Sequence, residues 1–75
     1  MNRYYIARNV GLEYNGGYKA ELMLKTLGLL GIEAEEKDRQ VEFISPDYCV
    51  DKIKEQIVFI CQYPKWALSI YEKKS

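Results

Sequence analysis

Hydrophobic residues along this chain recur at two spacings, and each spacing predicts a type of element. Residues 18–30 and 47–62 repeat apolar side chains every three or four positions, which predicts two helices. Four other segments alternate apolar with polar positions or are rich in aromatic and β-branched residues, which predicts strands: 3–10, 32–37, 40–44 and 65–72. The predicted order is strand, helix, strand, strand, helix, strand.

Glycine, serine and proline mark the expected helix boundaries. Gly31 stands where a left-handed cap ends the first helix. Ser45 is a good N-cap for the second helix, with Pro46 at the first helical position. Pro64 ends that helix, because proline disfavours helical geometry at the residue before it. The sequence therefore predicts sharp ends for both helices.

One antiparallel sheet with both helices on one face accommodates this order. It is the ferredoxin-like, split β-α-β arrangement (βαββαβ), a single α+β domain over residues 1–75 with its first and third strands at the centre. Residues 37–39 predict a hairpin turn. The register of the first strand stays open, because a slip by one residue exchanges its two faces. We expect an inward set of Tyr4 and Ile6 (or Tyr5 and Ala7 in their place), Ile32, Ala34, Val41, Phe43, Trp66, Leu68 and Ile70.

Size and charge favour association with another protein. A core in a chain of 75 residues rarely supplies more than about 3–5 kcal/mol, so self-association would help this fold. Eleven basic residues balance eleven acidic ones. The whole chain is therefore not attracted to nucleic acid or to an anionic membrane, and a net charge near zero favours association.

The sequence predicts a cytoplasmic protein. Residues 1–8 alternate polar and apolar positions rather than forming a signal sequence, and the longest apolar run, 57–61, is too short to cross a bilayer. Cys49 and Cys61 lie on one predicted helix, about 18 Å apart along its axis, which is too far for a disulfide. Two unpaired thiols fit a reducing compartment.

Catalytic and metal-binding patterns are missing from the sequence. The chain has no histidine, and the loop after the first strand has no cysteine, so we expect no metal site and no cofactor. Acylphosphatases share the predicted topology and place an arginine where the first helix begins, whereas this chain has Tyr18 and Lys19 there. Cys49 and Cys61 have no histidine to activate them. We therefore do not expect an enzyme.

An RNA-binding role is also disfavoured. Tyr5 and Tyr71 could stack on bases from the open face of the sheet. Glu33, Glu35 and Glu42 are expected on the same face, where their carboxylates repel phosphate. This acidic cluster is either a solvated sheet edge or a surface for a basic partner.

The outer faces of the two predicted helices carry apolar and aromatic residues where a soluble monomer usually has Lys, Glu and Gln. We expect the two sets to merge into one contact patch. The sequence therefore predicts a non-enzymatic protein-interaction module. It would act as a homodimer through its helix backs, or as a small inhibitor of the kind that viruses and mobile elements encode, docking on a larger protein. The predicted partner-binding residues are Tyr18, Leu22, Leu29, Tyr48, Lys52, Phe59 and Tyr63.

An alternative function uses the glycine loop before the first helix. Asn15, Gly16 and Gly17 leave backbone N–H groups open at a helix start, where anions bind. On this alternative the chain is a regulatory domain that binds a small molecule or nucleotide. Neither nucleotide-binding glycine pattern is complete, so the loop also fits an ordinary turn.

Overall fold

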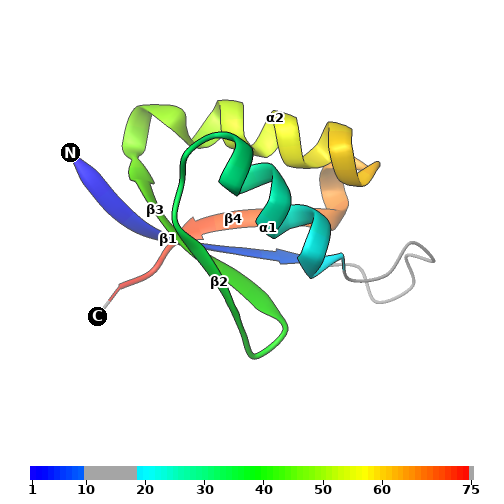
Figure 1. The fold of residues 1–75 in the computed structure, drawn as a ribbon, viewed down its shortest axis with the longest axis horizontal. Coiled ribbons are helices and arrows are strands. Elements are labelled where there is room, and N and C mark those ends of the chain that lie inside the picture. Colours follow the sequence, from blue (N-terminus) through cyan, green and yellow to red (C-terminus); the bar gives the residue numbers. More distant parts are fainter. Residues whose placement is uncertain (10–18, 75) are drawn as a thin grey trace.

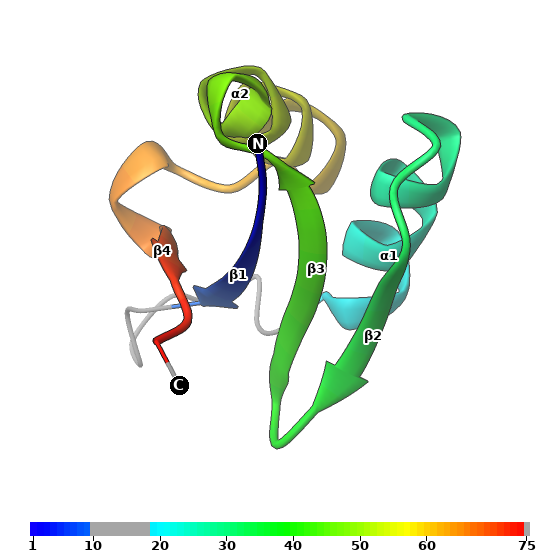
Figure 2. The ribbon, with the colours of Figure 1, turned by 90° about the vertical axis from the view of Figure 1, so that its left-hand side faces the viewer.

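The computed structural model describes residues 1–9 and 19–74, and its elements follow the predicted order (Figure 1). The four strands form one antiparallel sheet in the order β2-β3-β1-β4, and both helices cover the same face of it (Figure 2). This arrangement confirms the ferredoxin-like split β-α-β fold. The elements are β1 (Asn2–Asn9), α1 (Ala20–Leu29), β2 (Ala34–Lys37), β3 (Gln40–Pro46), α2 (Val50–Cys61) and β4 (Leu68–Glu72), with short 3₁₀ turns η1 (Asp47–Cys49) and η2 (Lys65–Ala67).

The core lies between the sheet and the two helices. Apolar stripes on α1 and α2 face the sheet, as their spacing predicts. The side chains that meet there come from both helices, from three strands and from the segment between α2 and β4. The buried cluster contains Tyr5, Ala7, Met23, Leu27, Val41, Phe43, Ile53, Ile57, Cys61, Tyr63, Ala67 and Leu68.

The register of β1 corrects our first expectation for this strand. Tyr5 pairs with Phe43 across β1 and β3, and the two rings stack with centroids 5.6 Å apart. Tyr5 and Ala7 therefore face the core, and Tyr4 and Ile6 lie on the other face of the sheet. The prediction that placed Tyr4 and Ile6 inward is wrong, and the one-residue alternative is confirmed.

The start of β4 differs from the prediction as well. The predicted strand began at residue 65, but residues 65–67 form a 3₁₀ turn closed by a 2.9 Å hydrogen bond from the Ala67 N–H to the Pro64 carbonyl. This turn buries Ala67 and leaves Trp66 largely exposed. The prediction that Trp66 faces the core is therefore wrong.

The end of α1 confirms the predicted glycine cap. Gly31 has φ +75°. The Ile32 N–H donates to the Leu27 carbonyl at 2.9 Å, and the Gly31 N–H donates to the Gly28 carbonyl at 3.0 Å. These two bonds form a Schellman motif, which satisfies carbonyls that the last turn leaves free.

The start of α2 does not use the predicted serine cap. β3 continues through Ser45 and Pro46, and the chain then enters η1 before the helix begins. The Ser45 hydroxyl donates to the Pro46 carbonyl at 2.8 Å rather than accepting from the helix. The N-cap prediction for Ser45 is therefore wrong, because the strand pairing extends one residue beyond it.

The β2–β3 hairpin is confirmed, and its turn is tight. Lys37 pairs with Gln40, so the loop between the strands is Asp38 and Arg39. Both residues have positive φ, 54° and 62°. Two positive φ values in a two-residue loop are the geometry that matches the twist of a hairpin.

Candidate interaction surfaces

The outer faces of α1 and α2 expose the large apolar side chains that the helical spacing predicted there. Leu29 is 82% exposed, Tyr48 80% and Phe59 78%, while Leu22 is partly exposed. Lys52 is exposed on the same side of α2 as Phe59, and Tyr48 lies in the turn η1 that precedes the helix. These five residues are available to a partner.

Tyr63 is not part of this surface, so its prediction as a partner-binding residue is corrected. Its side chain is only 4% exposed. The Tyr63 hydroxyl accepts a 2.9 Å hydrogen bond from the Lys19 N–H at the start of α1. The Lys19 ammonium lies 5.7 Å from the Tyr63 ring centroid and donates to the Cys61 carbonyl at 2.7 Å. Tyr63 therefore joins the start of α1 to the end of α2.

The exposed residues of the two helices do not line one common hollow. Leu22 borders a hollow with Glu36 of β2, whereas Phe59 borders another with Lys65 of η2. β2 and β4, which follows η2, are the opposite edges of the sheet. Leu22 and Phe59 therefore face different sides of the helix layer, and the linings do not support the single merged patch that we predicted.

The predicted ligand-binding loop and one predicted partner-binding residue lie outside the part of the chain that the structure describes. Asn15, Gly16, Gly17 and Tyr18 lie outside the described residues. The sequence pattern did not predict that Trp66 is exposed. Pro64, two positions earlier, was a sign that the strand does not begin before Trp66.

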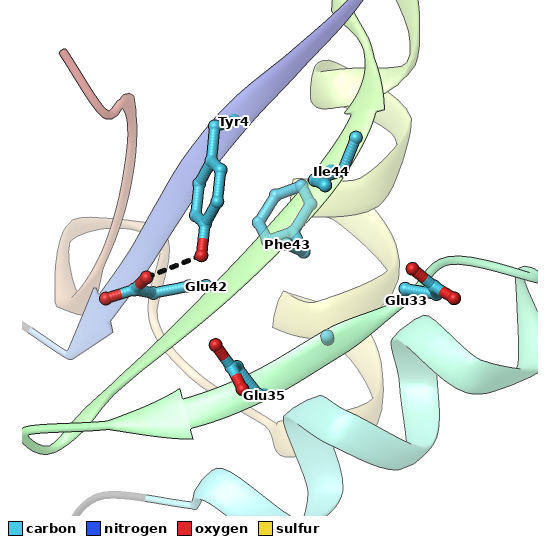
Figure 3. Close-up of a pocket in the computed structure, with 7 residues that line it drawn as sticks. Tyr4, Glu33, Glu35, Glu42, Phe43 and Ile44 are labelled. Atoms are coloured by element: carbon cyan, nitrogen blue, oxygen red, sulfur yellow. Dashed lines mark hydrogen bonds between the residues drawn. The ribbon is translucent and has the colours of Figure 1, made fainter. Parts of the chain in front are cut away.

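Neither α1 nor α2 covers the other face of the sheet (Figure 2). Strand alternation places Tyr4 and Ile6 of β1 on this open face, together with Glu42 and Ile44 of β3. Tyr4, Glu42 and Ile44 line a shallow hollow of about 470 Å³ with side chains from the β2 region (Figure 3). Tyr71 of β4, opposite Ile6, extends this face to the edge strand.

Glu42 is the centre of a polar network on the open face, and its side chain is only 3% exposed. Its carboxylate accepts hydrogen bonds from the Tyr4 hydroxyl at 2.8 Å, the Lys73 ammonium at 3.2 Å and the Gln40 amide at 3.3 Å. The Lys73 ammonium also lies 4.9 Å from the centroid of the Tyr4 ring. Three donors therefore compensate a carboxylate that the neighbouring side chains hold away from water.

The same contacts shift two pKa values. The hydrogen bond from Tyr4, followed by the one from Lys73, lowers the pKa of Glu42 below its ordinary value. The bond to Glu42, followed by loss of hydration, raises the pKa of Tyr4. At neutral pH the pair is therefore an ionised carboxylate with a protonated tyrosine.

The acidic residues lie where the sequence placed them. Glu33, Glu35 and Glu42 all line the hollow on the open face (Figure 3). The aromatic residues differ in one respect, because Tyr5 points into the core and Tyr4 takes its place on the open face beside β3. Carboxylates beside the aromatic rings leave a poor surface for phosphate.

The described residues offer little chemistry elsewhere. Among residues 1–9 and 19–74, no three His, Cys, Asp or Glu side chains are grouped so that they could hold a metal ion. No helix in this part of the chain is long and apolar enough to cross a membrane. Cys49 and Cys61 are free thiols, and burial raises the pKa of Cys61, which disfavours its reactive thiolate.

Comparison of the chain with protein families, with curated proteins and with solved structures finds no match. The two candidate interaction surfaces of this fold are the outer faces of the helices and the open face of the sheet.

The lowered pKa of Glu42 predicts a loss of stability in acid. The ionised network stabilises the fold fully above the ordinary glutamate pKa of about 4.3, and this contribution is lost as the pH falls through the lower folded value. Urea denaturation between neutral pH and pH about 3 should show a steeper fall for the natural chain than for Glu42→Gln. The control is Glu35→Gln, which changes the exposed carboxyl directly opposite on β2 and should keep the steep fall. Equal slopes for the natural chain and Glu42→Gln would contradict this role of the network.

Proposed function

We propose that this chain is a non-enzymatic protein-interaction module that binds another protein through the outer faces of α1 and α2. The observation that carries the proposal is the exposure of Leu29, Tyr48 and Phe59, each about four-fifths accessible to water. Covering exposed apolar side chains with a partner lowers the free energy of the complex by about 25 cal/mol per Å² of apolar surface buried. Exposed apolar side chains of this size often mark a contact surface.

The face of α2 is arranged as a binding stripe. Lys52, Glu55 and Phe59 follow one another at spacings of three and four residues, which places them on one side of α2, and Tyr48 precedes them in the turn η1. The two aromatic residues therefore precede and follow the lysine and the glutamate along the chain. Tyrosine and phenylalanine are enriched in the cores of interfaces, which a polar rim surrounds.

The proposed partner is a protein, either a larger one on which this small domain docks or a second copy. The inhibitor role and the cytoplasmic location belong to this proposal. The location is supported by the two free cysteines, which stay reduced in that compartment. The small-molecule alternative gains no support from the described residues, because its glycine loop lies outside them.

The test is partner capture from the native host with matched variants. The natural chain, Tyr48→Asp, Phe59→Asp and Ile44→Asp are each immobilised, and all four are expected to fold because the three positions are exposed. A protein held by the natural chain and by Ile44→Asp, but lost with both helix variants, is the expected result. A captured protein that both helix variants retain would contradict the proposal, as would a natural chain that holds no host protein and has no self-association that Tyr48→Asp and Phe59→Asp abolish.

A further inference from the structure

The open face of the sheet has a charge arrangement that complements itself. Glu33 and Glu35 lie on its β2 side. Lys73 lies on its β4 side, where its N–H bonds to the Tyr4 carbonyl at 2.7 Å. Apolar and aromatic side chains of the central strands lie between the two sides, namely Tyr4, Ile6 and Ile44, with Tyr71 at the β4 side. The face therefore runs from acidic to basic across a central band that is apolar apart from Glu42.

The strand register orders these residues into rows across the sheet. In one row Glu35 is opposite Glu42, Glu42 is opposite Ile6, and Ile6 is opposite Tyr71. In the neighbouring row Glu33 bonds through its carbonyl to Ile44, Ile44 is opposite Tyr4, and Tyr4 bonds to Lys73. Each of these two rows begins with a carboxylate at the β2 side and ends with a hydrogen-bond donor at the β4 side, while the row at the hairpin end begins with Lys37, which is opposite Gln40.

We infer that this face binds a second copy of the chain, sheet against sheet, about a two-fold axis parallel to the strands. Such an axis exchanges the β2 and β4 sides and keeps each row at its height along the strands. Glu33 then lies over Lys73 of the second copy, and Glu35 lies over the Tyr71 hydroxyl. An axis perpendicular to the strands would instead place Glu35 over Glu35, where the like charges repel.

Burial of this face costs little because its central charge is already compensated. The Glu42 carboxylate has three donors within its own chain, so this charge keeps its partners when the face is covered. Ile44 and Tyr71 are each nearly half exposed and would become covered. The two sheets would pack about 10 Å apart with the helices outside, which leaves Tyr48 and Phe59 free for the proposed partner.

The first test measures the oligomeric state of the natural chain by analytical ultracentrifugation. We expect a concentration-dependent dimer. Ile44→Asp and Tyr71→Asp should each weaken it by roughly a hundredfold and keep the natural circular dichroism spectrum, because both side chains are at the surface. Phe59→Asp should leave the dimer unchanged, which separates this inference from the proposed function of the helix faces. A natural chain that stays monomeric at millimolar concentration, or a dimer broken by Phe59→Asp but not by Ile44→Asp, would overturn the inference.

The second test determines the axis by disulfide cross-linking, in a Cys49→Ala background that leaves only the buried Cys61. Glu35→Cys and Tyr71→Cys proteins, one of them enlarged by a tag, are oxidised alone and as a mixture. The expected result is a disulfide-linked mixed dimer and little cross-linking of either protein with itself. Rapid cross-linking of Glu35→Cys with itself, or none in the mixture, would overturn the proposed axis.

Discussion

Replacing Phe43 with alanine should leave this domain largely unfolded at room temperature. Phe43 lies on the central strand β3, is 1% exposed and stacks on Tyr5 of β1. Truncating a buried phenylalanine costs about 3–5 kcal/mol. A single core of this size supplies about the same amount in total, so little stability should remain. Far-ultraviolet circular dichroism and urea denaturation would measure the loss.

The matched control is the same substitution at the other phenylalanine. Phe59 is 78% exposed on α2, so Phe59→Ala should change the free energy of unfolding by no more than about 0.5 kcal/mol. Phe43→Ala that unfolds as cooperatively as the natural chain and at a similar urea concentration would contradict this account of the core. So would an equal loss from Phe59→Ala, since that side chain would then have a structural role.

The sequence was sufficient for the fold because the helices carry strong local patterns. Met23 and Leu27 on α1, like Ile53 and Ile57 on α2, recur at helical spacing and face the sheet. Gly31 ends α1 as its sequence position indicates. Two helices, each with an apolar stripe, and four short strands leave few arrangements that bury both stripes, and the observed one was among them.

The register of β1 could not be decided in this way. The strand has apolar residues at adjacent positions, Tyr4 with Tyr5 and Ile6 with Ala7. A strand at the centre of a sheet has neighbours on both sides, and here Ile6 is buried on the open face as well. Alternation therefore gives no answer, and the choice depends on the pairing of Tyr5 with the distant Phe43.

The same distinction between local patterns and contacts distant in sequence applies to the candidate surfaces. Exposure of Leu29 and Phe59 follows from helical spacing alone, so the sequence was enough to find them. Tyr48 is exposed as well, but it lies in the turn η1 before α2. The sequence could not predict the Glu42 network, because Tyr4 and Lys73 are 38 and 31 residues away from Glu42 along the chain. No local pattern reports a contact of that separation.

Tyr63 failed as a surface prediction because of one backbone conformation. Helical spacing was continued to residue 63, which would have pointed its side chain outward. Gln62 instead adopts a left-handed conformation with φ 57°, and this turns the chain so that Tyr63 enters the core. Since glutamine at this position carries no turn signal, the reversal had no local sign apart from Pro64.

The buried position of Tyr63 leads to the second large effect. Tyr63→Ala should destabilise the domain by about 3–5 kcal/mol, as expected for a buried aromatic side chain, and should free the start of α1 from the end of α2. Tyr63→Phe keeps the ring and removes only the hydroxyl that accepts from the Lys19 N–H, so it should cost about 0.5–1.5 kcal/mol. The control is Tyr48→Ala, at an 80% exposed position, which should be nearly neutral in urea denaturation. If Tyr63→Ala were as stable as Tyr48→Ala, the Tyr63 side chain would not join the two helices. Tyr63 would then again be a candidate partner-binding residue.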